Sequence, residues 1–126
     1  MICKMCKLDH DWTIEEALQR LEKGPAVIRK ALSGAGPEEL GWALPKAWSP
    51  KQVAVHLLDT EMVYGVRVRK ILSEDNAIVP AYDQDCWAAA CSDGRELGHV
   101  LDTFESLRRD NLAPFRASVA RLDRTC

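Results

Sequence analysis

The chain has 126 residues, of which 47% are hydrophobic and 29% charged, and its formal net charge is −2. This length suits one domain with a buried core, and the composition is that of an ordinary globular protein. The slightly acidic balance argues against a nucleic-acid partner, because phosphate binding needs a basic face. No stretch approaches the ~20 apolar residues of a membrane span, and no signal peptide is recognisable. We therefore expect one domain over residues 1–126, with an N-terminal segment at 1–12, located in the cytoplasm and without a membrane partner.

Five cysteines are an odd number for a disulfide framework, and in a reducing compartment we expect free thiols. Cys3 and Cys6 form a CxxC pair, and His10 lies four residues beyond it. These residues alone fall short of a complete zinc site, and no second CxxC pair exists. Two free thiols on a loose terminus are therefore favoured over a metal or redox role. Cys86 and Cys91 are expected to be buried as small apolar side chains.

The first long helix is predicted to begin at Thr13. Thr13 and Glu16 have the spacing of a capping box, in which each side chain accepts a hydrogen bond from the other residue's backbone N–H. Gly24-Pro25 interrupts the pattern, and because proline lacks an N–H and crowds the preceding turn, we expect a kink or two successive helices. The glycine- and proline-rich run 33–37 ends the element. Apolar residues recur through the segment at helical spacing: Ile14, Ala17, Leu18, Leu21, Ile28 and Leu32.

The second long helix has the clearest start signal. Ser49 is a good N-cap, Pro50 suits the first helical position, and Gln52 completes a capping box. Trp48 and Val53 occupy the two positions of a hydrophobic staple. The connector before this helix, residues 37–48, is expected to pack over the end of the bundle.

This second helix is predicted to run to about Ser73, with His56 on its apolar side or at the edge of it. An isolated histidine beside an apolar stripe is typically a core or boundary residue with one hydrogen-bond partner. Metal ligation is the alternative, and the two interpretations remain open on spacing alone.

A second connector, residues 74–93, includes a short predicted helix over 87–91. The third long helix is predicted to start near Asp93, where Asp93 and Glu96 have capping-box spacing. Pro114 should bend it, and His99 falls off its inward stripe. That stripe comprises Leu97, Leu101, Phe104, Leu107, Leu112, Phe115, Val119 and Leu122.

The fold class predicted from these patterns is all-α. No run of alternating β-branched residues indicates a sheet. Three long helices do not bury all their apolar faces well, and a four-helix bundle is the usual solution. The sequence shows no fourth helical pattern. We therefore expect a fourth helix to be absent or supplied by another chain, and an exposed groove to favour a homodimer.

The segment 48–61, WSPKQVAVHLLDTE, resembles the W-S-x-x-E-V-x-x-H-L-x-D-x-E signature of the DinB/YfiT-like superfamily. The Gly24-Pro25-Ala26 break, the loop 80–87 and the segment 104–112 follow in the order that this family shows. The resemblance covers nearly the whole chain from about Trp12. It implies an up-down helical bundle of the DinB/YfiT type, in which three histidines bind a divalent metal, commonly nickel or zinc.

His56 matches the first of those three family histidines, and the resemblance therefore makes it a metal ligand. The other two form an H-x-x-x-H pair on the fourth helix, which has no match here. Asp59 lies one turn beyond His56, at i+3, and could orient the imidazole. We favour the alternative, in which Asp59 is a solvated carboxylate on the helix surface. Glu61 and Arg67 also match family positions, and an ion-pair role is favoured for both. The tryptophans are read as packing residues rather than as a stacking surface for substrate.

Three functions compete. The resemblance implies a divalent-metal-dependent thiol S-transferase or hydrolase acting on a small-molecule or thiol substrate, with an incomplete histidine site in this chain. The alternative is a non-catalytic, truncated relative that acts as a dimeric binding or structural module. A third is a metal or redox sensor using Cys3, Cys6 and His10.

Overall fold

The computed structural model describes residues 11–122, with side chains to residue 119. Within that range the chain forms five helices and no strand: α1 (Ile14–Leu32), α2 (Pro37–Gly41), α3 (Pro50–Ser73), α4 (Gln84–Cys91) and α5 (Leu97–Leu122). The all-α prediction is confirmed. The N-terminal CxxC pair, His10 and Cys126 lie outside the described residues.

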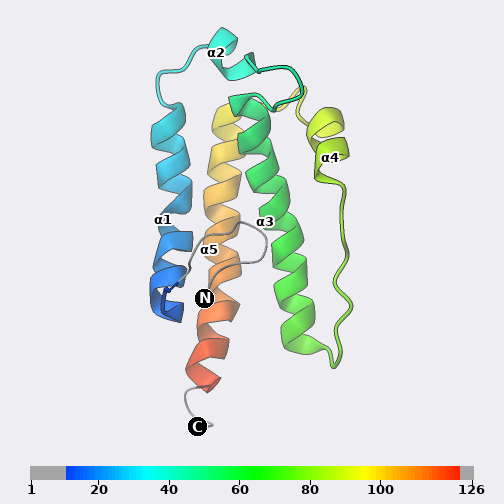
Figure 1. Cartoon of the computed structure of the whole chain (residues 1–126). Helices are drawn as coiled ribbons and strands as arrows, with labels where there is room; N and C mark the ends of the chain where they lie inside the picture. Colours follow the sequence, from blue (N-terminus) through cyan, green and yellow to red (C-terminus); the bar gives the residue numbers. More distant parts are fainter. Residues whose placement is uncertain (1–10, 123–126) are drawn as a thin grey trace.

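The three long helices lie side by side, with α1 and α3 each packed against α5 (Figure 1). The chain runs up α1, down α3, and then returns along the outside through residues 74–83 and α4 before descending α5. α3 and α5 are therefore parallel, so the three long helices do not alternate strictly up and down as the resemblance implied. The short helix α2 crosses the upper end of the bundle, as expected for the first connector, although Trp42 beside it is 64% exposed.

The predicted starts of the first two long helices are confirmed. The Thr13 and Ser49 side chains each accept from the N–H three residues on, and Glu16 and Gln52 accept from the cap residues' N–H groups. The predicted start near Asp93 is wrong by several residues. The carboxylate of Glu96 instead accepts from the N–H groups of the second and third residues of α5, at 2.8 Å each, so Glu96 caps the helix.

The Gly24-Pro25 break does not divide the first helix, because α1 continues through Pro25. Proline has no N–H to donate to the carbonyl four residues earlier, which belongs to Leu21. That carbonyl accepts a 2.6 Å hydrogen bond from Nη1 of Arg108 on α5. Gly24 leaves room for this guanidinium, since a Cβ there would lie 3.3 Å from the same nitrogen. A side chain from another helix thus replaces the missing backbone bond.

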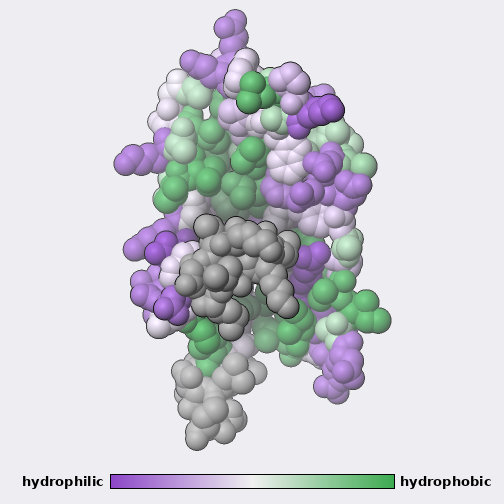
Figure 2. All heavy atoms as spheres, in the orientation of Figure 1, coloured by the Kyte–Doolittle hydropathy of each residue, from purple (hydrophilic) through white to green (hydrophobic). Residues whose placement is uncertain are grey.

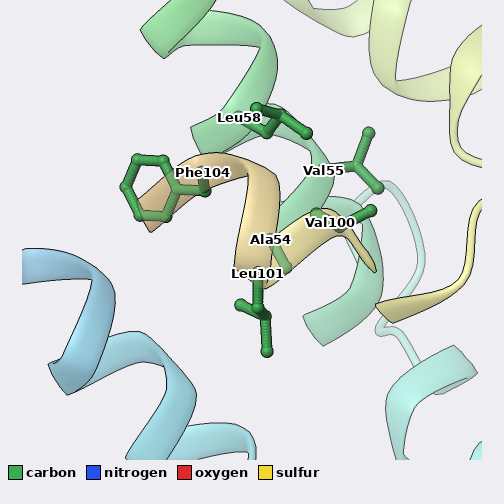
Figure 3. Close-up of a cluster of buried hydrophobic side chains, with 6 residues drawn as sticks. All are labelled: Ala54, Val55, Leu58, Val100, Leu101 and Phe104. Atoms are coloured by element: carbon green, nitrogen blue, oxygen red, sulfur yellow. The ribbon is translucent and has the colours of Figure 1, made fainter. Parts of the chain in front are cut away.

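The hydrophobic core lies between α3 and α5, with Ile28 and Leu32 of α1 packed against it. Figure 3 shows six buried side chains from these two helices meeting at their interface. Val55 and Val100 are fully buried there. The six are Ala54, Val55, Leu58, Val100, Leu101 and Phe104.

A buried polar cluster joins the same helices farther along. Glu61 of α3 accepts from Arg108 Nε at 2.7 Å and from Asn111 Nδ2 at 2.9 Å. Asn111 also donates to the Glu61 carbonyl at 3.1 Å. This close approach depends on Gly65, where a Cβ would stand 2.6 Å from Asn111 Oδ1. The ion pair expected for Glu61 is confirmed as an interhelical one.

α1 and α3 flank one face of α5, and this face is hollowed. One cleft of about 490 Å³ is lined by residues including Val27, Leu57 and Phe104, and another of about 410 Å³ by residues including Tyr64 and Phe115. Arg108 lines both clefts. Hydrophobic side chains gather on the upper part of this face in Figure 2. We refer to the two clefts together as the α1/α3 groove. Over residues 11–122, no helix has the length and apolar character of a membrane span.

Candidate functional site

His56 lies half-buried on α3, beside the core rather than within it. The ring of Trp48, immediately before the cap of α3, packs against the imidazole with centroids 4.7 Å apart and planes inclined by 53°. On the same helix, Thr60 Oγ1 lies 3.3 Å from His56 Nε2 and 3.5 Å from Nδ1. The ring is therefore held between an indole and a hydroxyl, the environment of a boundary histidine with a hydrogen-bond partner.

The Thr60 hydroxyl has a second partner in the chain segment that returns along α3. Tyr82 Oη lies 2.6 Å from Thr60 Oγ1. The Tyr82 ring packs in turn against Trp87 of α4, with centroids 4.8 Å apart. Residues far apart in sequence thus form a continuous set around the imidazole, which we call the His56 cluster: Trp48, His56, Thr60, Tyr82 and Trp87. Trp48 and Trp87 thus each pack against another aromatic ring of the cluster.

Arg67 holds the same returning segment two turns farther along α3. Its Nε and Nη2 donate to the Pro80 carbonyl at 3.1 and 2.7 Å, and its guanidinium carbon lies 5.5 Å from the Tyr64 ring centroid. The ion pair favoured for Arg67 is therefore replaced by a backbone contact. This contact fixes the segment two residues before Tyr82.

Asp59 is not the solvated carboxylate that was favoured, nor does it contact His56 in this structure. It is 3% exposed and accepts from Arg95 Nη1 at 2.8 Å. Its Oδ2 has no hydrogen-bond partner among the described residues. Asp59 points toward the segment between α4 and α5 because that is where Arg95 stands. The Asp59 carboxylate therefore joins α3 to the segment before α5 and does not orient the imidazole.

The predicted burial of Cys86 and Cys91 is wrong, since both are exposed free thiols. α4 is a short helix at the edge of the bundle with Ala88 as its only buried residue, so its cysteines lie on its outer side. The pKa of Cys86 is raised above its ordinary value, mainly because Asp83 accepts a hydrogen bond from the thiol and repels the thiolate. Cys86 is accordingly a poor nucleophile at neutral pH.

The described residues do not complete a metal site. Between residues 11 and 119, no three His, Cys, Asp or Glu side chains converge in a way that could hold an ion. His99 is exposed on α5, as predicted from its position off the inward apolar stripe of that helix. His56 supplies one imidazole, and a protein metal site of the kind expected needs further ligands.

Sequence reasoning missed Thr60, Tyr82 and Arg95 as partners of the family positions. The i, i+4 spacing of His56 and Thr60 places them on one helix face and could have suggested that pair. Nothing in the sequence indicated that Tyr82, 22 residues along the chain, would reach the same hydroxyl.

The structure is thus a helical bundle with a half-buried histidine on its second long helix. The model of the DinB superfamily matches residues 20–126. The chain belongs to the DinB superfamily.

Two relatives illustrate the match. Over 97 residues the chain is 26% identical to a protein of Oceanobacillus iheyensis named "Putative metal-dependent hydrolase", covering 76% of this chain and 56% of that protein. The structure of YfiT from Bacillus subtilis, described as "a probable metal-dependent hydrolase with an unusual four-helix bundle topology", superposes with a TM-score of 0.79 at 23% identity. That match covers 88% of this chain and 66% of YfiT. The chain thus spans between about half and two thirds of the length of these relatives.

Proposed function

We propose that this protein is a divalent-metal-dependent hydrolase or thiol S-transferase of the cytoplasm, and that His56 is one ligand of its metal, nickel or zinc. The observation that carries the proposal is the setting of His56: a half-buried imidazole, packed on Trp48 and contacted by the hydroxyl of Thr60. A metal-binding histidine commonly has such an arrangement, since its second nitrogen bonds a neighbouring group that fixes the ring. The names of the two relatives support a metal-dependent hydrolase.

A divalent ion held by three imidazoles keeps an open position and makes a bound water or thiol acidic enough to act as a nucleophile near neutral pH. Within this chain, His56 would bind the ion and Thr60 would orient the imidazole. Trp48 covers one face of the ring and limits the access of water to it. Because the described residues supply no second and third ligand, we propose that these come from residues outside 11–122 or from another chain.

Metal analysis of the purified protein tests this assignment. We expect zinc or nickel to bind stoichiometrically by calorimetry and elemental analysis, and His56→Ala to abolish binding. His99→Ala is the matched control, because His99 is an exposed histidine on another helix, and it should bind as the parent does. Metal retained by His56→Ala and lost by Cys3→Ser would contradict the proposal and favour the CxxC segment.

The second candidate is the dimeric, non-catalytic module, and the α1/α3 groove favours it. Tyr64 and Phe115 line this groove and are 53% and 40% exposed. We propose that a second copy of the chain covers the groove, since a two-fold contact would bury these residues on both partners. In this function neither the parent nor His56→Ala binds metal.

Light scattering with size-exclusion chromatography tests the dimer. The parent should elute as a dimer at micromolar concentration, and Phe115→Asp should be monomeric. Ile78→Asp is the control, because Ile78 is 84% exposed and does not line the groove. A folded, monomeric parent chain would rule the dimer out.

A further inference from the structure

The chain contains two histidine–threonine pairs with the same spacing, and their threonines behave differently. On α5, Thr103 follows His99 by four residues, and its Oγ1 donates to the His99 backbone carbonyl at 2.8 Å. This is the ordinary bond of a threonine inside a helix. On α3, Thr60 follows His56 by four residues, yet its Oγ1 contacts the two imidazole nitrogens of His56.

The difference lies in a third residue. Tyr82 Oη stands 2.6 Å from Thr60 Oγ1, a short hydroxyl–hydroxyl hydrogen bond. A threonine hydroxyl has one hydrogen and two lone pairs. Holding it against the phenol therefore takes it away from the backbone and leaves it facing the imidazole. Among the described residues, Thr103 makes no hydrogen bond to another side chain and keeps the backbone bond.

Tyr82 is itself held at several points, although it lies in a segment without regular structure. Its ring packs on Trp87 at 4.8 Å. Two residues earlier, the Pro80 carbonyl accepts two hydrogen bonds from Arg67 of α3. The segment is thus attached to α3 at Arg67 and at Thr60. These contacts fix the phenol beside α3.

We propose that Tyr82 is a positioning residue for His56, which it orients through Thr60. The tyrosine holds the Thr60 hydroxyl against the imidazole, 3.3 Å from Nε2 and 3.5 Å from Nδ1. We infer that the hydroxyl forms its hydrogen bond with one of these nitrogens only, which would leave the other nitrogen with a defined orientation and tautomer. Trp48 also limits rotation of the imidazole by packing on the ring. A role of Tyr82 in metal binding rests on the proposed function, whereas its role in orienting the His56 ring does not.

The first measurement therefore uses the metal-free protein. Nitrogen-15 spectra of histidine side chains, recorded at a pH where the imidazoles are neutral, report the tautomer of each ring. We expect His56 to show one dominant tautomer in the parent. Tyr82→Phe and Thr60→Val should bring it toward a mixture of the two tautomers, and Thr60→Ser should preserve the parent spectrum because it keeps the hydroxyl.

Two matched controls separate this role from a general effect on folding. Tyr64→Phe removes the only other tyrosine hydroxyl, on an exposed ring. Thr103→Val removes the equivalent threonine on α5. Neither should change the His56 spectrum. A mixed His56 tautomer in the parent, or a spectrum unchanged in a folded Tyr82→Phe variant, would overturn the proposal.

The second measurement is zinc and nickel affinity by calorimetry. Loss of an orienting partner of a metal-binding histidine typically weakens binding by about 10- to 100-fold. We expect Tyr82→Phe and Thr60→Val to weaken binding by about tenfold, with Thr60→Ser and Tyr64→Phe close to the parent. If the parent binds neither ion, the proposed function fails, while the tautomer spectra still decide the role of Tyr82. Parent-like affinity in Tyr82→Phe would overturn the part of the inference that concerns the metal.

Discussion

Replacing Arg108 by alanine should destabilise the bundle strongly. Its side chain is 15% exposed and pairs at 2.7 Å with the Glu61 carboxylate, which is 7% exposed. It also donates to the Leu21 carbonyl that Pro25 leaves without its helical donor. The substitution would leave one buried carboxylate without its cation and one carbonyl without its donor.

Removing one partner of a buried ion pair typically costs about 3–5 kcal/mol. An unsatisfied carbonyl adds about 1–3 kcal/mol where water cannot reach it. Because the groove beside Arg108 can admit water, we expect the lower part of the combined range, about 4–5 kcal/mol. That is a large share of the roughly 5–15 kcal/mol by which domains are stable.

Urea unfolding followed by circular dichroism measures this loss. Arg109→Ala is the matched control, because the neighbouring arginine is 79% exposed and lies 3.7 Å from Glu105, so its loss should cost under about 1 kcal/mol. The double variant Arg108→Met with Glu61→Leu should recover much of the stability, since this cluster then contains no unpaired buried charge. The reasoning fails if Arg108→Ala costs no more than Arg109→Ala.

Three further predictions concern single positions. Gly65→Ala should destabilise the protein by about 1–3 kcal/mol in urea unfolding, because the new Cβ would stand 2.6 Å from Asn111 Oδ1. Glu96→Gln should lower the melting temperature at neutral pH: two backbone N–H bonds lower the pKa of Glu96, so its stabilisation is present above the unfolded-state pKa and lost as pH falls through the folded one. Asp83→Asn should speed alkylation of Cys86, measured by mass spectrometry, because the carboxylate raises the pKa of that thiol.

Each of these three has a clear contrary result. Gly41→Ala is the control for the first, since no atom lies within 4 Å of its Cβ position, and equal losses at both glycines would refute the packing argument. For Glu96, the gap between parent and variant must close in acid, and a gap independent of pH would show that the carboxylate charge is irrelevant. For Cys86, an unchanged alkylation rate would mean that Asp83 does not restrain the thiol.

The sequence by itself determined the three long helices and where two of them begin, but it did not predict α2 and it placed the start of α4 three residues late. Thr13 with Glu16, and Ser49 with Gln52, are local signals that act within one turn, so no distant residue was needed to interpret them. The start of α5 was misplaced because Asp93 and Glu96 are both competent caps, and the choice between them depends on how the preceding segment leaves α4. The family signature likewise identified His56 without any knowledge of its surroundings.

Only the tertiary structure decided what those residues touch. Pro25 was predicted to interrupt the first helix, but Arg108, 83 positions away, donates a hydrogen bond to the Leu21 carbonyl that the proline cannot bond. Asp59 was predicted to be solvated, but it is paired with Arg95 from the segment before α5. The Thr60 hydroxyl contacts Tyr82 because the chain segment after α3 runs back along that helix. Helical periodicity says which side of a helix is apolar, because that depends on residues a few positions apart. It does not say which distant side chain will meet a given polar atom, because that depends on how the helices pack.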